Sequence, residues 1–133
     1  MKGIPLVDGH LDLAENVTLF GRDLTQSVEA IRAVERRGNG QATVSLPELK
    51  RGEIAVVLAT VTAAFLEADV GPDFESPSAI YATPEEAEAQ ALAQIALYRR
   101  WESEGRVRCS CLPAMWSTIS TSGAPIASRG WSC

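Results

Sequence analysis

Short continuous apolar runs interrupt the polar pattern of this chain at a few places. The run at residues 4–7 predicts a first strand, and the run at residues 54–64, rich in Val and Thr, predicts a second. Runs of this composition are typical of strands buried on both faces of a parallel sheet. A short β-like run at residues 42–46 follows the same pattern, and residues 106–108 predict the start of a further strand.

Helical periodicity fills the intervals between these runs. Residues 11–20 show a mixed pattern that fits a short helix or an ordered loop, with Gly21 as a stop. Residues 23–37 carry apolar side chains at helical spacing, and Gly38-Asn39-Gly40 predicts their end. One helical turn is predicted at residues 46–52, closed by Gly52. The apolar positions of the 23–37 helix are Val28, Ile31 and Val34.

The clearest helix begins after Thr83. A hydroxyl at Thr83, Pro84 in the first turn and Glu86 at the third helical position form the pattern of a capping box. Gly105 predicts where this helix ends. Its expected buried stripe consists of Ala87, Ala91, Leu92, Ile95 and Tyr98.

Strands that alternate with helices indicate an α/β fold with a parallel sheet. Residues 66–82, with their glycine, prolines and acids, are expected to form a loop. The 133 residues correspond to one domain, and the net charge of −5 argues against a nucleic-acid partner. No apolar run approaches the ~20 residues that cross a bilayer, so we expect no membrane contact and a cytoplasmic location.

The end of the first strand carries the candidate chemistry. Ile4–Val7 is followed by Asp8-Gly9-His10-Leu11-Asp12, and residues i and i+2 of a strand point to the same side. His10 and Asp12 are therefore expected to converge on one point. Imidazole and carboxylate are a common ligand pair for zinc and similar ions. A hydrogen-bonded histidine at a strand end is the alternative for His10. Asp8 is expected to be a turn or capping carboxylate.

Four segments together resemble the N-terminal part of the membrane dipeptidase family, also called renal-dipeptidase-like or M19 metallopeptidases. The resemblance rests on their order and spacing, because no single segment is specific. The segments are Val7-Asp8-Gly9-His10-Leu11-Asp12, Val44-Ser45-Leu46-Pro47-Glu48-Leu49-Lys50-Arg51-Gly52, the strand 54–62, and Tyr81-Ala82-Thr83-Pro84-Glu85-Glu86-Ala87.

This resemblance implies the N-terminal portion of a (β/α)8 TIM barrel, incomplete in this chain, and zinc-dependent hydrolysis of dipeptides. By resemblance, His10 and Asp12 would be ligands of one of two zinc ions. The family's bridging Glu, further His ligands and later catalytic Asp have no counterpart here, and His10 is the only histidine. We therefore expect a truncated, inactive product and name no catalytic residue.

Two other functions stay open from the sequence. The first is a non-catalytic α/β binding or assembly module that buries its open sheet edge against a partner. The second is another metal hydrolase of the amidohydrolase type, with different substrates. An incomplete barrel leaves parallel strand edges exposed, so oligomers or aggregates through that edge are expected.

The composition changes abruptly at residue 108, which divides the chain into a barrel-like part, 1–108, and an atypical tail, 109–133. All 17 acidic residues lie at or before Glu104, whereas residues 110–133 hold six serines and no acid. The tail carries all three cysteines, too few and too clustered for a disulfide framework. A disordered tail is the alternative, but disordered tails are usually poor in tryptophan, and two of the three tryptophans, Trp116 and Trp131, lie here.

We therefore predict that the tail is out-of-frame translation or otherwise foreign to the fold. Reading the coding DNA in the other two frames beyond codon 108 tests this. A frame that restores the α/β pattern and downstream His and Glu ligands is the expected result. If neither frame continues the pattern, the hypothesis is wrong.

Overall fold

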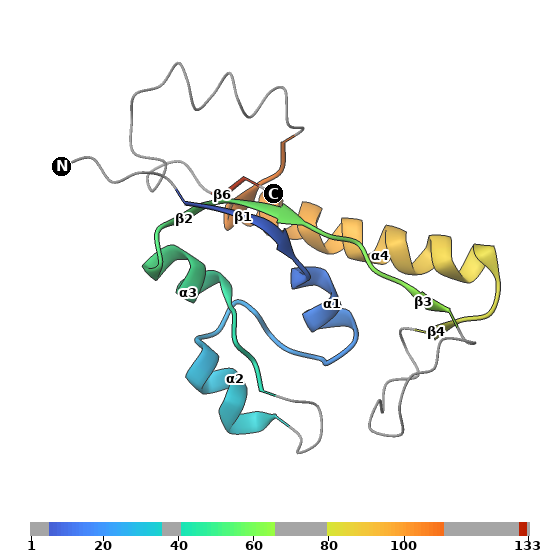
Figure 1. Ribbon diagram of the computed structural model, residues 1–133, viewed down its shortest axis with the longest axis horizontal. Coiled ribbons are helices and arrows are strands. Elements are labelled where there is room, and N and C mark those ends of the chain that lie inside the picture. Colours follow the sequence, from blue (N-terminus) through green and yellow to red (C-terminus); the bar gives the residue numbers. More distant parts are fainter. Residues whose placement is uncertain (1–5, 36–40, 66–79, 111–130, 133) are drawn as a thin grey trace.

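The computed structural model describes residues 6–35, 41–65, 80–110 and 131–132. Within these ranges the chain forms a mixed α/β structure whose paired strands are all parallel (Figure 1). The strands are β1 (Leu6–Leu11), β2 (Ile54–Ala59), β3 (Ala64–Phe65), β4 (Ile80–Tyr81), β5 (Val107–Arg108) and β6 (Trp131–Ser132). The helices are α1 (Leu13–Thr18), α2 (Val28–Val34), α3 (Leu46–Arg51) and α4 (Pro84–Ser103).

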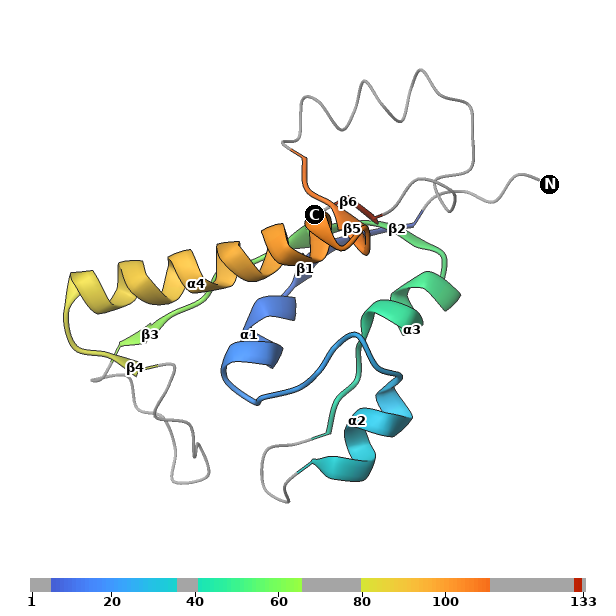
Figure 2. The same cartoon turned by 180° about the vertical axis from the view of Figure 1, so that it is seen from behind.

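The main sheet has the strand order β1-β2-β6-β5, and β3 and β4 form a separate pair. Helices α1, α2 and α3 lie between β1 and β2 in the chain, as a parallel pair requires a crossover connection. Figures 1 and 2 show α4 running alongside β2 and β3 in both views. None of the helices in the described ranges is both long enough and apolar enough to cross a membrane.

The predicted second strand is correct at its start and too long at its end. β2 covers Ile54–Ala59, and residues 60–63 are irregular before β3 begins. The β-like run at residues 42–46 is wrong: this stretch is irregular up to Leu46, which begins α3. Its backbone groups find partners outside any sheet, because Arg32 Nε donates to the Ala42 carbonyl (2.7 Å) and Leu46 N–H donates to the Leu24 carbonyl (2.9 Å).

Helix α2 is shorter than the predicted 23–37 segment. Ser27 is its N-cap and accepts a hydrogen bond from the Ala30 N–H. The helix ends at Val34 because Glu35 is already extended, with φ −63° and ψ 141°. The glycines predicted to stop it, at residues 38 and 40, lie outside the described residues. Glu35 instead turns its carboxylate back onto Arg22 Nε (2.6 Å) and the Ala42 N–H.

Helix α4 begins and ends as the sequence predicts. Thr83 Oγ1 accepts from the Glu86 N–H, and Glu86 Oε2 accepts from the Ala82 N–H (2.7 Å), one residue before the donor that an ideal capping box uses. At the other end, Gly105 has φ +70°. Its N–H donates to the Glu102 carbonyl and the Arg106 N–H to the Trp101 carbonyl, the paired hydrogen bonds of a Schellman motif.

The buried face of α4 differs from the predicted stripe. Tyr98 is buried, but Leu92 and Ile95 are exposed. The residues of α4 that are buried are Gln94, Leu97, Tyr98 and Trp101. The predicted stripe is displaced around the helix, because it omits the apolar residues Leu97 and Trp101 as well as the buried Gln94.

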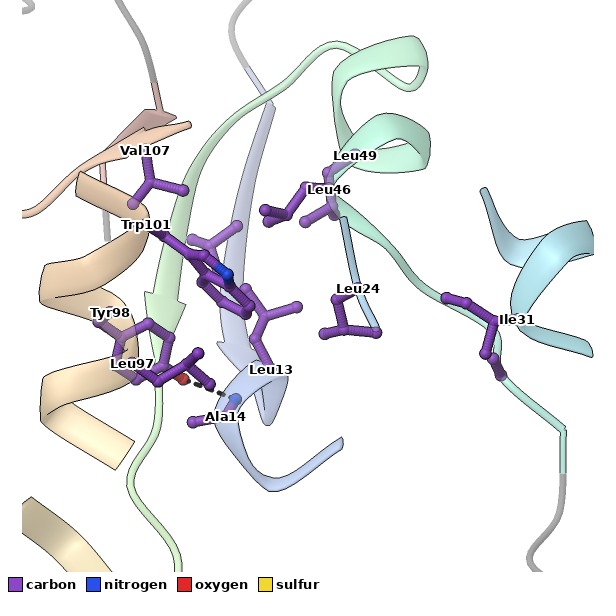
Figure 3. Close-up of a cluster of buried hydrophobic side chains, with 12 residues drawn as sticks. Leu13, Ala14, Leu24, Ile31, Leu46, Leu49, Leu97, Tyr98, Trp101 and Val107 are labelled. Carbon is purple, nitrogen blue, oxygen red and sulfur yellow. Dashed lines mark hydrogen bonds between the residues drawn. The ribbon is translucent and has the colours of Figure 1, made fainter. Parts of the chain in front are cut away.

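One hydrophobic cluster joins all four helices to the sheet (Figure 3). Trp101 lies near its centre with 1% exposure, among side chains from α1, α3 and the α1–α2 connection. The tryptophan ring meets the Tyr98 ring edge-on at 5.9 Å. The buried members are Leu13, Ala14, Leu24, Ile31, Ala42, Leu46, Leu49, Val57, Leu97, Tyr98, Trp101 and Val107.

The outer side of β1 is one of two unpaired edges of the main sheet within the described residues, the other being the outer side of β5. Among the described residues, β1 pairs with β2 alone, and its first residues Leu6 and Val7 are largely exposed. Association through this edge stays a prediction. Of the predicted tail, the described residues 131–132 form β6, which pairs with Val56 of β2 on one side and with β5 on the other.

Two leucines of α4 test which face of the helix is buried. Leu97 is 8% exposed and Leu92 is 56% exposed. We expect Leu97→Ala to lower the free energy of unfolding by about 2–3 kcal/mol, because it removes buried methyl groups and leaves a cavity. Leu92→Ala should change it by less than about 0.5 kcal/mol. Urea unfolding followed by circular dichroism measures both, and equal losses would contradict the burial described.

Candidate metal site at the carboxyl ends of β1 and β2

The carboxyl ends of β1 and β2 lie level with each other. The two strands are parallel, and Leu11 is paired with Ala59. Asp12 and Thr60 follow directly, so residues 48 positions apart in sequence come into contact. Side chains at the carboxyl ends of parallel strands are where α/β proteins usually place their sites.

Strand β1 is irregular just before this end. Asp8 pairs with Val57 and Leu11 pairs with Ala59. Between these two pairs β1 has two residues, whereas β2 has one, so β1 contains one extra residue. This extra residue is a β-bulge, a feature that re-aims side chains beside active sites. Asp8 Oδ1 accepts the His10 N–H (3.0 Å), which supports the backbone within the bulge. Asp8 is thus a turn carboxylate, one of the two roles that the sequence predicts for it.

The bulge and the strand end bring the two predicted metal ligands together. His10 Nε2 lies 3.4 Å from Asp12 Oδ2. The imidazole is 73% exposed and the carboxylate 35% exposed, so the pair is open to solvent on the imidazole side. An exposed contact of this kind contributes at most about 1 kcal/mol to stability, so the fold does not depend on it.

Asp12 occupies the N-cap position of α1 but does not cap it. An aspartate there normally accepts an N–H from the first turn of the helix, yet the Asp12 side chain makes no such bond. The Ala14 N–H of that turn donates instead to the Tyr98 hydroxyl (3.0 Å), which reaches across from α4 (Figure 3). The Asp12 carboxylate is left to contact His10 and to accept a hydrogen bond from the Thr60 hydroxyl.

A second acid lies close behind Asp12. Burial raises the pKa of Glu15, in the first turn of α1, and the negative charge of Asp12 raises it further. The two carboxylates therefore form a small region of negative potential at the strand ends. Such a region attracts a cation, and a cation there would relieve the repulsion between the acids.

The distance within the His10–Asp12 pair suits zinc. Ligand atoms about 2.0–2.2 Å from a tetrahedral zinc ion lie about 3.3–3.6 Å from each other. The Nε2–Oδ2 distance of 3.4 Å falls within that range. In the described ranges, no group of three or more His, Cys, Asp or Glu side chains is arranged to hold a metal ion. The pair therefore fits two corners of a zinc shell.

Sequence reasoning missed three polar residues around this pair. Thr60 lies within the predicted strand at residues 54–64, Tyr98 lies in the predicted apolar stripe, and Gln94 is a polar residue of the predicted helix. Gln94 accepts from the Thr62 N–H (3.0 Å) and donates to the Thr62 carbonyl, which ties α4 to the segment after β2. The available signal was the position of Thr60 and Thr62 near the end of the second apolar run.

Comparison of the chain with protein-family models, with curated proteins and with solved structures finds no match.

Removing the Tyr98 hydroxyl tests how the strand ends are held. We expect Tyr98→Phe to lower the free energy of unfolding by about 1–3 kcal/mol, because it leaves the buried Ala14 N–H without a partner. The Thr60 carbonyl loses its hydrogen bond from the same hydroxyl (2.9 Å). Urea unfolding measures the loss, and a change below about 0.5 kcal/mol would show that neither bond matters.

Proposed function

We propose that His10 and Asp12 form one corner of a zinc site in a metal-dependent hydrolase of the dipeptidase type. The observation that carries this proposal is the Asp12 carboxylate, which leaves its capping position and lies 3.4 Å from the only imidazole of the chain. Local rules of sequence and structure are most often broken at functional sites, where another requirement outweighs them.

Three of the residues present would have different roles in such a site. His10 would supply a neutral nitrogen ligand, and Asp12 would supply an oxygen ligand and a negative charge that offsets the charge of the ion. Zinc, when bound, would lower the pKa of a coordinated water molecule and polarise a substrate carbonyl. Glu15 would add negative potential from behind Asp12 without contacting the ion directly.

The dipeptide substrate and the (β/α)8 barrel come from the resemblance of the sequence to the membrane dipeptidases. The parallel pairing of β1 and β2 and the helices between them support the opening of such a barrel. His10 and Asp12 alone leave at least half of a tetrahedral zinc shell to water. We therefore propose a partial site that binds zinc weakly and expect no dipeptide hydrolysis by this chain.

The single histidine makes the proposal directly testable. His10 gives the only imidazole signals in a nuclear magnetic resonance spectrum, so a Zn²⁺ titration follows one site without assignment ambiguity. We expect saturable shifts of these signals. Asp12→Asn should weaken Zn²⁺ binding at least about tenfold, since even partners of metal ligands contribute 10–100-fold.

Asp8→Asn is the matched control for this experiment. It removes the same charge near His10 but keeps the oxygen that accepts the His10 N–H. We expect it to change the affinity by less than about threefold, because Asp8 Oδ1 is engaged by the His10 backbone N–H and an exposed charge that does not bind the ion contributes little. The proposed site would be overturned if the imidazole signals do not shift in millimolar Zn²⁺, or if both variants lose Zn²⁺ affinity equally.

A further inference from the structure

We propose that Thr60 is a positioning residue for Asp12: its hydroxyl holds one carboxylate oxygen, so that the other faces His10. This inference rests on the proposed zinc site. The contacts divide the two oxygens between two partners. Thr60 Oγ1 donates to Asp12 Oδ1, while Asp12 Oδ2 is the oxygen nearest His10 Nε2.

The Thr60 hydroxyl has a choice of acceptors, and charge decides between them. Oγ1 lies within reach of Asp12 Oδ1 and 3.4 Å from the Leu11 carbonyl oxygen. A hydroxyl has a single proton to donate, and hydrogen bonds to ionised acceptors are about twice as strong as those between neutral groups. The proton therefore goes to the carboxylate, which fixes the rotation of Asp12.

The backbone of Thr60 is held on two sides, which makes it a firm support. Its N–H donates to the Leu11 carbonyl (3.3 Å), which continues the β1–β2 pairing by one step. Its own carbonyl accepts from the Tyr98 hydroxyl (2.9 Å). Two residues further on, the Gln94 side chain hydrogen-bonds to both the N–H and the carbonyl of Thr62. Helix α4 thus sets the position of Thr60, and Thr60 sets that of Asp12.

A hydrogen bond of this kind has a known effect on metal sites. Partners that orient a ligand fix its geometry before the ion arrives, and removing them lowers metal affinity 10–100-fold. Threonine suits this position because its β-branched side chain has few χ1 rotamers. The structure thus places a two-step chain of contacts, Thr60 to Asp12 to His10, across the ends of β1 and β2.

The test compares variants at Thr60 and at a neighbouring threonine. Thr60→Val keeps the shape and removes the hydroxyl, and we expect Zn²⁺ binding, read from the His10 signals, to weaken about tenfold. Thr60→Ser should stay within about twofold of the parent because it retains the hydroxyl. Thr62→Val is the matched control, since the hydrogen bonds of Thr62 run through its backbone.

A metal-free measurement separates this inference from the zinc site itself. Because Nε2 faces Asp12, we expect the neutral His10 ring to carry its proton on Nε2, which ¹⁵N shifts at alkaline pH report. Thr60→Val should move the tautomer ratio toward that of Asp12→Asn, and Thr62→Val should not. Urea unfolding verifies that each variant is folded.

The outcomes are distinct. If the parent chain ignores Zn²⁺ but the tautomer ratio responds to Thr60→Val, the zinc site fails and the positioning role stands. If Thr60→Val matches the parent in tautomer ratio, or in Zn²⁺ affinity where the parent binds, the positioning role is overturned. A loss in Thr60→Val that Thr60→Ser does not restore overturns it as well.

Discussion

The arrangement of the strand ends depends on the two hydrogen bonds made by the Tyr98 hydroxyl. The hydroxyl accepts from the Ala14 N–H of α1 and donates to the Thr60 carbonyl after β2, so one oxygen atom joins α4 to both strand ends. Both partners are main-chain groups that a buried structure has to satisfy. Its position follows from Trp101, which packs against the Tyr98 ring and anchors α4 in the core.

This bond also explains why Asp12 can serve another purpose. An N-cap aspartate typically stabilises a helix by about 0.5–2 kcal/mol. Helix α1 lacks this stabilisation, because the Asp12 side chain makes no capping hydrogen bond. Tyr98 satisfies the N–H that Asp12 leaves, so the cost at the helix end is reduced. The carboxylate then lies beside Glu15, whose raised pKa records the burial and the repulsion from Asp12. Fold and site are linked at this one helix terminus.

Local signals in the sequence were sufficient where the backbone itself determines the structure. Thr83 and Gly105 marked the ends of α4 because capping and positive φ depend on a few adjacent residues. The approach of His10 to Asp12 was also predictable from their spacing, although a bulge contributes to it. Thr60 could not be found this way, since its role requires the register between two strands and the hydroxyl of a distant tyrosine. The buried face of α4 also depends on distant partners: Gln94 is buried by its hydrogen bonds to Thr62, and Leu97 and Trp101 are buried by packing against other elements.

The place of β6 in the sheet has a consequence for the order in which the chain folds. β6 lies between β2 and β5, although it is the last strand in sequence. During synthesis, β2 and β5 leave the ribosome well before the strand that joins them. Contacts of this separation form slowly, and unpaired strand edges promote aggregation while they persist. The nascent chain therefore passes through a stage in which β2 and β5 are both made while the strand that pairs with each of them is still missing.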